Sequence, residues 1–306
     1  MLRTIVAAVT LTAALTITAE PAAADPLPVK YDFIDAILKG QARPNAAPPG
    51  TNDFSCRPSA EHPNPVVLVH GTAANMALSW RAIGPELKNR GFCVFALNYG
   101  RLYPGPSFGL ARIERSAREL GVFVDRVLAA TGATKVDIIG HSQGGMMPRQ
   151  YLRFEGGAGK VGTLVGMSPS NHGSGDPDEV DAPSRVPAWV RNWLRSLTSS
   201  LAPAFAQQSA GSPFMRQLNE GGDTVPGVRY VVIQTRYDEI VTPWTSALLD
   251  GPDVTNIVVQ DGCEQNKIDH AAIVYDRRAV GYALRALDPS DTSPVPCTRP
   301  RPWVGG

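Results

Sequence analysis

The pentapeptide Gly-His-Ser-Gln-Gly at residues 140–144 constrains the fold of this chain more than any other segment. It directly follows an apolar, strand-like run and opens a helix-like run at residues 143–154. A serine in a sharp turn between a strand and a helix is a nucleophile elbow, which lifts the hydroxyl clear of the sheet. Gly140 and Gly144 leave room where a side chain would collide with the neighbouring strand and helix. The alternative is a chance match, but the flanking strand and helix favour Ser142 as the nucleophile of a hydrolase.

Apolar runs of strand length alternate with segments of helical periodicity along the rest of the chain. The strand-like runs are residues 65–70, 93–98, 135–139, 161–167, 229–234 and 254–259. The helix-like segments are residues 80–89, 110–130, 143–154 and 271–287. Nearly all-apolar strands separated by helices predict an α/β fold, with a mostly parallel central sheet covered by helices on both faces. Polar residues at the carboxyl ends of such strands should share one mouth, and these are His70, Ser142, Ser168 and Asp238.

The first residues have the pattern of a secretory signal. Arg3 supplies a positive start, residues 5–17 are mostly apolar, and residues 22–24 are three alanines that suit cleavage. The alternative is a membrane anchor, but a span requires about 20 apolar residues and this stretch is shorter. We therefore expect a removed signal at residues 1–24 and a secreted, extracellular protein. The remaining residues 25–306 suit one large α/β domain.

The four cysteines agree with export, because disulfides form in oxidising compartments. Four cysteines allow three pairings, and their positions favour Cys56 with Cys93 and Cys263 with Cys297, since each pair ties a loop to a nearby element. Buried free thiols are the alternative. The sequence has no Cys-x-x-Cys motif or His/Cys cluster that would suggest a metal site. A formal net charge of +1 argues against a nucleic-acid partner.

A serine hydroxyl needs a base, so one of the five histidines should assist Ser142. Where an elbow carries the serine, the triad runs along the chain in the order serine, acid, histidine. Only His172 and His270 follow Ser142, and His172 precedes any strand end that carries an acid. His270 is therefore the predicted base, although a lone histidine is more often structural.

The acid should follow a core strand between the serine and the histidine. Asp238 lies on the first loop after the apolar run at residues 230–234, whereas the adjacent Glu239 should point elsewhere in a turn. Asp238 would accept a hydrogen bond from His270, fix its tautomer and stabilise the imidazolium. A solvated turn aspartate is the alternative. Four other aspartates more often serve in turns or caps: Asp250, Asp253, Asp261 and Asp269.

An ester's tetrahedral intermediate also needs donors for its oxyanion. One should be the backbone N–H of Gln143, which directly follows the nucleophile. The other should come from the loop after the first strand, where Gly71 allows a turn and Thr72 offers both its N–H and its hydroxyl. A simple strand-ending turn at His70 and Gly71 is compatible with this role.

Together these motifs resemble secreted bacterial lipases of the α/β-hydrolase fold and are similar to the fungal Candida antarctica lipase B. The matching segments are residues 69–72, 140–145, 238–243, and Cys263 with residues 268–271. The resemblance implies Ser142, Asp238 and His270 as the triad and Thr72 and Gln143 as the oxyanion hole. It also implies hydrolysis of acylglycerols or related lipid esters without a cofactor. One departure is His141, which stands where the fungal enzyme has tryptophan.

A segment at about residues 169–227 interrupts the strand–helix rhythm and is predicted to form a lid or cap over the mouth. It contains an apolar stripe at helical spacing, made of Trp189, Val190, Trp193, Leu194, Leu197 and Leu201. The stripe suits a helix packed on the body or a lid that meets lipid, and Phe205, Phe214 and Met215 could extend such a rim. We expect a monomer that contacts a lipid surface transiently. A short-chain esterase, a polyester depolymerase and a silent lipid-binding homologue remain alternatives.

Overall fold

The computed structural model describes residues 25–175 and 202–306. The predicted signal at residues 1–24 and the stripe at residues 189–201 therefore lie outside the described residues. The predicted cap is described only at its two ends. In the part of the chain that the structure describes, no helix is long and apolar enough to cross a membrane.

A six-stranded, all-parallel sheet forms the centre of the molecule, in the order β2-β1-β3-β4-β5-β6. The strands are β1 (Val66–Val69), β2 (Val94–Leu97), β3 (Val136–His141), β4 (Val161–Met167), β5 (Arg229–Gln234) and β6 (Val254–Val258). All six predicted strands are thus confirmed. The inner strands β1 and β3 are buried throughout, as expected for a parallel sheet covered on both faces. Of the two edge strands, β6 is partly exposed, whereas β2 is buried throughout.

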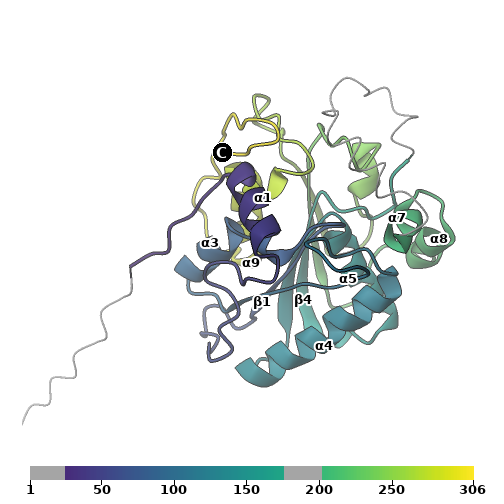
Figure 1. The fold of residues 1–306 in the computed structure, drawn as a ribbon, viewed down its shortest axis with the longest axis horizontal. Helices are drawn as coiled ribbons and strands as arrows, with labels where there is room; N and C mark the ends of the chain where they lie inside the picture. Colours follow the sequence, from purple (N-terminus) through teal and green to yellow (C-terminus); the bar gives the residue numbers. More distant parts are fainter. Residues whose placement is uncertain (1–24, 176–201) are drawn as a thin grey trace, which may run out of the picture.

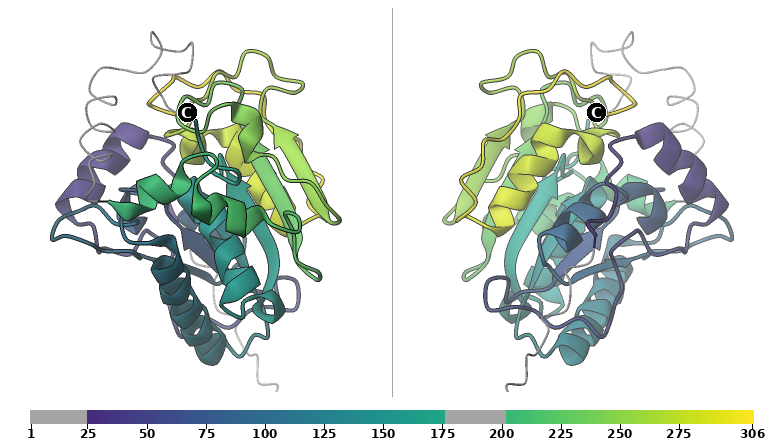
Figure 2. Two further views of the ribbon diagram at one scale, coloured as in Figure 1. Left: turned by 90° about the vertical axis from the view of Figure 1, so that its right-hand side faces the viewer. Right: turned by 90° about the vertical axis from the view of Figure 1, so that its left-hand side faces the viewer.

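Helices cover both faces of this sheet, as the sequence predicts (Figures 1 and 2). One face packs against α4 (Ile113–Thr131) and α5 (Gln143–Phe154). The other packs against α1 (Phe33–Ala42), α2 (Met76–Ser79), α3 (Ile83–Asn89) and α9 (Arg277–Leu287). Short 3-10 turns are η1 (Ala158–Lys160), η2 (Trp244–Ala247) and η3 (Ile273–Tyr275). Alternate residues of each strand enter the two cores, which is the period of a β-strand.

Three helix boundaries differ from the prediction, each for a local reason. The helix expected at residues 80–89 begins only at Ile83, because Pro85 fits only within a first turn, and the short helix α2 before it was not predicted. The helix expected at residues 110–130 begins at Ile113 and ends at Thr131, where the following Gly132 closes it in the left-handed conformation with a φ of 75°. The helix expected from residue 271 begins only after Asp276, whose side chain caps α9.

Helix α1 is absent from the helix-like segments that the sequence predicts. Asp32 caps its first turn by accepting a hydrogen bond from the Asp35 N–H. Its buried face packs against α2, and a Cβ on Gly40 would lie only 2.6 Å from the Cβ of Leu78. Such a close crossing requires glycine. The helix therefore depends on a neighbour that the local sequence does not reveal.

The described ends of the predicted cap are α7 (Pro203–Gln208) and α8 (Pro213–Asn219). Phe214 and Met215 of α8 are buried in the same core as α5, so the expectation that they extend an apolar rim is wrong. Phe205 of α7, in contrast, lines the cavity described below. A lid role for the whole segment stays a prediction.

Both predicted disulfides are present. Cys56 pairs with Cys93 and Cys263 pairs with Cys297. The first bridge ties the loop before β1 to the residue before β2, and the second ties the loop after β6 to the C-terminal segment. The alternative of free thiols is thereby excluded, since none of the four cysteines is unpaired.

Candidate active site

Ser142 lies at the tip of a strained turn between β3 and α5. Its backbone has φ 54° and ψ −122°, a conformation that non-glycine residues rarely adopt. A Cβ on Gly140 would lie 1.8 Å from the Gly144 carbonyl oxygen, and one on Gly144 would lie 2.1 Å from the Val69 carbonyl oxygen. Neither position can hold a larger residue without moving the backbone. The glycines thus have the steric role that the sequence predicts for a nucleophile elbow.

Ser142 faces a cavity of about 610 Å³ at the carboxyl ends of the strands. His270 and Thr72 line the same cavity, so three of the predicted site residues meet there. Most of the remaining wall is apolar and comes from α1, α7 and the loops after β5 and β6, including Phe33, Ile37, Pro203, Phe205, Ile240, Val241 and Val274. A polar group surrounded by apolar walls is the usual arrangement of a site for an apolar ligand.

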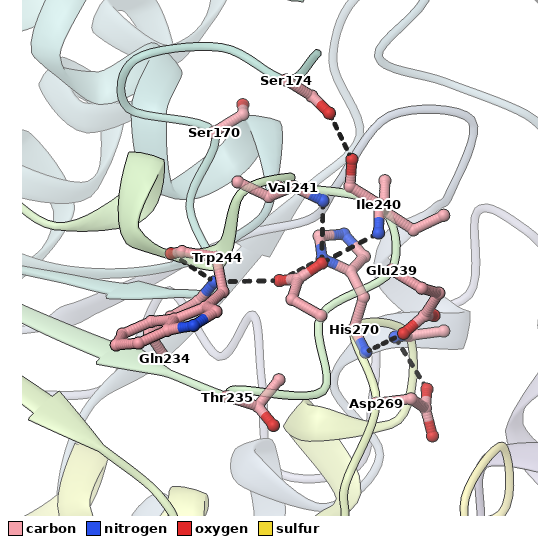
Figure 3. A network of polar contacts seen from close by, with 12 residues as sticks. Ser170, Ser174, Gln234, Thr235, Glu239, Ile240, Val241, Trp244, Asp269 and His270 are labelled. Atoms are coloured by element: carbon pink, nitrogen blue, oxygen red, sulfur yellow. Dashed lines mark hydrogen bonds and ion pairs between the residues drawn. The ribbon is translucent and has the colours of Figure 1, made fainter. Parts of the chain in front are cut away.

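The predicted acid and base are in direct contact. Figure 3 shows the network of polar contacts around His270. His270 Nδ1 lies 2.9 Å from Asp238 Oδ2, and the carboxyl group is fully buried. Asp238 also accepts from the backbone N–H groups of Ile240 at 3.0 Å and Val241 at 2.7 Å, and from Gln234 Nε2 at 3.1 Å. Since the carboxylate only accepts, His270 Nδ1 carries a proton and Nε2 is left as the basic nitrogen. This is the tautomer that a general base requires.

The environment keeps the Asp238 carboxyl group ionised. Burial alone would raise its pKa, but the positive charge available at His270 and the hydrogen bonds from His270, Val241 and Ile240 hold the pKa below its usual value. A buried anion beside the imidazole stabilises the imidazolium that forms when His270 takes a proton.

His141 supports the loop that carries His270. Its Nε2 lies 2.9 Å from the backbone carbonyl oxygen of His270, and the two rings are 5.0 Å apart. A carbonyl oxygen only accepts, so Nε2 is the protonated nitrogen. Burial lowers the pKa of His141 to about 3, so the ring is neutral at neutral pH. No sequence motif assigns His141 a role beyond the elbow itself.

Glu239 is a second residue whose position the sequence did not reveal. Its Oε2 accepts from the backbone N–H of His270 at 3.4 Å, while Oε1 is enclosed and has no partner among the described residues. Burial and the nearby charges of Asp238 and Asp269 raise its pKa well above the usual value, so the group stays protonated. It lies against the backbone of His270, whereas Asp238 contacts the ring.

One predicted oxyanion residue belongs to the elbow and the other to the loop after β1. Gln143 is the first residue of α5, so its N–H belongs to the helix N-terminus, where anions are favoured. Thr72 follows β1, the immediate neighbour of β3 in the sheet, and borders the cavity. The side chain of Gln143 donates to the Thr72 hydroxyl at 3.0 Å. The two residues are therefore linked directly.

The histidine set aside at sequence level lies in a different network. His172 contacts Asp223 at 3.0 Å and the Ser246 carbonyl at 2.9 Å, and Asp223 also pairs with the buried Arg149 at 3.3 Å. His172 is absent from the cavity wall. Among the described residues, no group of three or more His, Cys, Asp or Glu side chains could hold a metal ion.

A parallel six-stranded sheet with a nucleophile elbow at the end of β3 defines an α/β hydrolase. Residues 63–280 match the sequence profile of the family described as Lipase (class 2). Because this match spans more than half of the chain, the protein belongs to the class 2 lipase family.

Curated relatives resemble one part of the chain. Triacylglycerol lipases of Pseudarthrobacter phenanthrenivorans and Burkholderia plantarii are each 40% identical to it over 92 residues. Those alignments cover 28% of this chain and only 27% and 24% of the two relatives. The chain thus matches about a quarter of the length of each relative.

Solved structures extend the likeness of fold. Aspergillus fumigatus lipase B superposes on 83% of this chain and 57% of its own, with a TM-score of 0.61 and 22% identity. The mature form of Bacillus licheniformis lipase BlEst2 covers 76% of this chain and 94% of its own, with a TM-score of 0.53 and 16% identity. At these identities the comparison shows the shared α/β-hydrolase fold alone.

Proposed function

We propose that this protein hydrolyses carboxylic esters of lipids, acylglycerols or related compounds, through an acyl-enzyme on Ser142. The observation that carries the proposal is the contact of 2.9 Å between His270 and the buried Asp238, at a cavity that Ser142 also lines. The apolar wall of that cavity supports an ester with an apolar acyl chain. The triacylglycerol lipases that resemble part of the chain support the same substrate class.

In the proposed mechanism, His270 Nε2 removes the proton from Ser142 as its Oγ attacks the ester carbonyl. The carbonyl oxygen becomes an anion, which the N–H groups of Gln143 and Thr72 and the Thr72 hydroxyl stabilise. Collapse of the intermediate breaks the ester C–O bond, and the imidazolium gives its proton to the leaving alcohol. Water then attacks the acyl-enzyme by the same route and releases the acid. Asp238 stays ionised throughout.

Covalent labelling tests the nucleophile. Treatment with an alkyl phosphonate followed by peptide mass spectrometry should place the adduct on Ser142, and Ser142→Ala should abolish both labelling and ester hydrolysis. Ser168→Ala is the matched control, because Ser168 also ends a strand and its buried hydroxyl has no partner among the described residues. It should keep its activity. Labelling at another serine, or hydrolysis that survives in Ser142→Ala, would reject the proposal. Wild-type turnover no higher than background and equal to that of Ser142→Ala would favour a catalytically silent fold.

The preferred acyl-chain length of the substrate distinguishes a lipase from a short-chain esterase, and activity on a polymer distinguishes it from a polyester depolymerase. We expect higher rates on glycerol and nitrophenyl esters of long acyl chains, measured below and above their solubility limits, than on acetate esters. A preference for acetate or butyrate would indicate a short-chain esterase. Release of soluble acids from an aliphatic polyester film, faster than from any monomeric ester, would indicate a depolymerase.

We also propose that the protein is exported. The two disulfides support an oxidising compartment. N-terminal sequencing of the protein recovered from culture medium should begin at Asp25. Recovery of a protein that still begins at Met1, confined to the cells, would contradict the proposal.

A further inference from the structure

The hydroxyl oxygen of Thr72 accepts two hydrogen bonds from side-chain amides. Gln143 Nε2 lies 3.0 Å from Thr72 Oγ1, and Gln208 Nε2 lies 2.9 Å from the same oxygen. Gln143 belongs to the elbow helix α5. Gln208 is the last residue of α7, a separate helix that also lines the cavity. Two distant segments therefore meet at one hydroxyl group.

The orientation of both amides is fixed by backbone carbonyls. Gln143 Nε2 lies 3.0 Å from the Gly109 carbonyl oxygen, and Gln208 Nε2 lies 3.0 Å from the Ala204 carbonyl oxygen. A carbonyl oxygen can only accept, so in each case the nitrogen, and not the oxygen, must face it. Ser170 Oγ donates to Gln208 Oε1 at 2.9 Å, which agrees with this orientation. Each amide thus directs one N–H to a carbonyl and the other to Thr72.

The consequence concerns the single proton of the Thr72 hydroxyl. A hydroxyl group has two acceptor positions and one donor proton. The two amides occupy both acceptor positions, and no described residue accepts the proton from Thr72. Thr72 borders the cavity that Ser142 lines. The proton is therefore available to an acceptor that enters this cavity.

We propose that Gln208 is a positioning residue, which together with the Gln143 side chain holds the Thr72 hydroxyl as a donor to the oxyanion. The inference rests on the proposed function, since it assumes an oxyanion at this place. Donors set in advance stabilise a developing charge without reorganisation during the reaction. Gln208 contacts the substrate carbonyl only through Thr72 in this scheme, so its effect should appear in kcat and leave KM almost unchanged.

Substitutions that differ only in hydrogen bonding test this role. Gln208→Met keeps the length of the side chain but removes the amide, and kcat should fall about tenfold, the value of one neutral hydrogen bond. Gln208→Glu presents only acceptors when ionised, so the Thr72 proton should turn toward the carboxylate. Its kcat should fall further, toward the loss of about 100-fold expected for removal of one oxyanion donor. The KM of both variants should stay within about twofold of wild type.

A double-mutant cycle separates an effect through Thr72 from a general effect. Thr72→Val should lower kcat about 100-fold, and Thr72→Ser, which keeps the hydroxyl, should restore most of it. The Thr72→Val, Gln208→Met double variant should be no slower than Thr72→Val alone. Gln207→Met is the matched control on the same helix, because Gln207 bonds Glu114 and the Ile113 N–H but not Thr72. It should lower the melting temperature and leave kcat within about twofold.

Several outcomes would overturn the inference. The losses of the two single variants could multiply in the double variant, or Gln207→Met could lower kcat as much as Gln208→Met. An increase in KM with unchanged kcat would show that Gln208 only shapes the cavity wall. If Thr72→Val does not fold, the comparison of Gln208→Glu with Gln208→Met still decides, since equal kcat values would refute the proton argument. Normal phosphonate labelling of Ser142 with unchanged kcat at Gln208→Met would refute this inference while the proposed function stands.

Discussion

The hydrogen bond from His141 to the His270 carbonyl allows a test of how the triad is held together. His141→Phe keeps a flat ring of similar size but removes the N–H donor, leaving a buried carbonyl oxygen unsatisfied. Such a loss costs about 1–3 kcal/mol. For a domain of this size each kcal/mol lowers the melting temperature by about 2–4 °C. We expect His141→Phe to lower kcat/KM by about 100-fold, which is the loss that follows when a loop shift moves the imidazole by about 1 Å.

His141→Gln is the matched variant, because it retains an N–H donor but does not titrate. We expect it to recover most of the activity lost in His141→Phe. The neutral state of His141 adds a pH effect of known sign. Its pKa is about 3 in the folded protein and near 6.5 when unfolded, so acid favours the unfolded state throughout this interval. At pH 5 this costs the folded protein about 2 kcal/mol.

Chemical denaturation at pH 5 and pH 7.5, together with kinetics over the same range, measures both effects. The free energy of unfolding should fall less between pH 7.5 and pH 5 in His141→Gln than in wild type, by about 2 kcal/mol. The acid limb of kcat/KM should be the same in both proteins, because His141 stays neutral there. Full activity of His141→Phe would refute the idea that this bond positions His270. A displaced acid limb in His141→Gln would refute the neutral state of His141.

Three further expectations follow from the same structure. Asp238→Asn should lower kcat by about 10⁴-fold in steady-state assays, because the amide favours the wrong tautomer of the base, and a loss below tenfold would contradict the role of the acid. Glu239→Gln should change the pH dependence of stability: the raised pKa of Glu239 stabilises the folded protein below about pH 4.5, and this contribution is lost as pH rises. Urea denaturation at pH 4 and pH 8 should show the variant gaining relative to wild type at pH 8, and an equal difference at both pH values would exclude ionisation at this site. Replacing both Cys56 and Cys93 with alanine opens a link between residues 37 apart and should lower the free energy of unfolding by about 4 kcal/mol, whereas an unchanged denaturation midpoint would show that the bridge contributes little.

The six strands could be predicted because each carries its own signal. A parallel strand buried on both faces is a short apolar run that needs no knowledge of its neighbours. The elbow is equally local, since the turn at Ser142 and the two contacts of Gly140 and Gly144 are formed by residues close in sequence or on the adjacent strand. The pairing of Asp238 with His270 also followed from chain order, because the carboxyl ends of parallel strands lie at one edge.

What the sequence concealed depends on contacts between distant segments. Gln208 is an ordinary polar residue at the end of a short helix, and only its contact with Thr72 gives it a role. Glu239 follows the acid directly, yet the fold and not the local pattern turns its carboxyl group toward the backbone of His270. The sequence allows Phe214 to extend an apolar rim of the mouth, but the packing of α8 against the body buries it.

The order of the strands explains why a histidine must complete this site. Ser142 ends β3 and Asp238 follows β5, with β4 between them. Adjacent strands are about 4.8 Å apart, so the two strand ends are separated by roughly 10 Å, too far for a carboxylate to act on the serine directly. His270 comes from beyond β6 and meets Asp238 on one ring nitrogen, which leaves the other nitrogen for the side of the serine. The imidazole can span this gap only if its loop is held in place, and the bonds to its backbone from His141 and Glu239 supply that restraint.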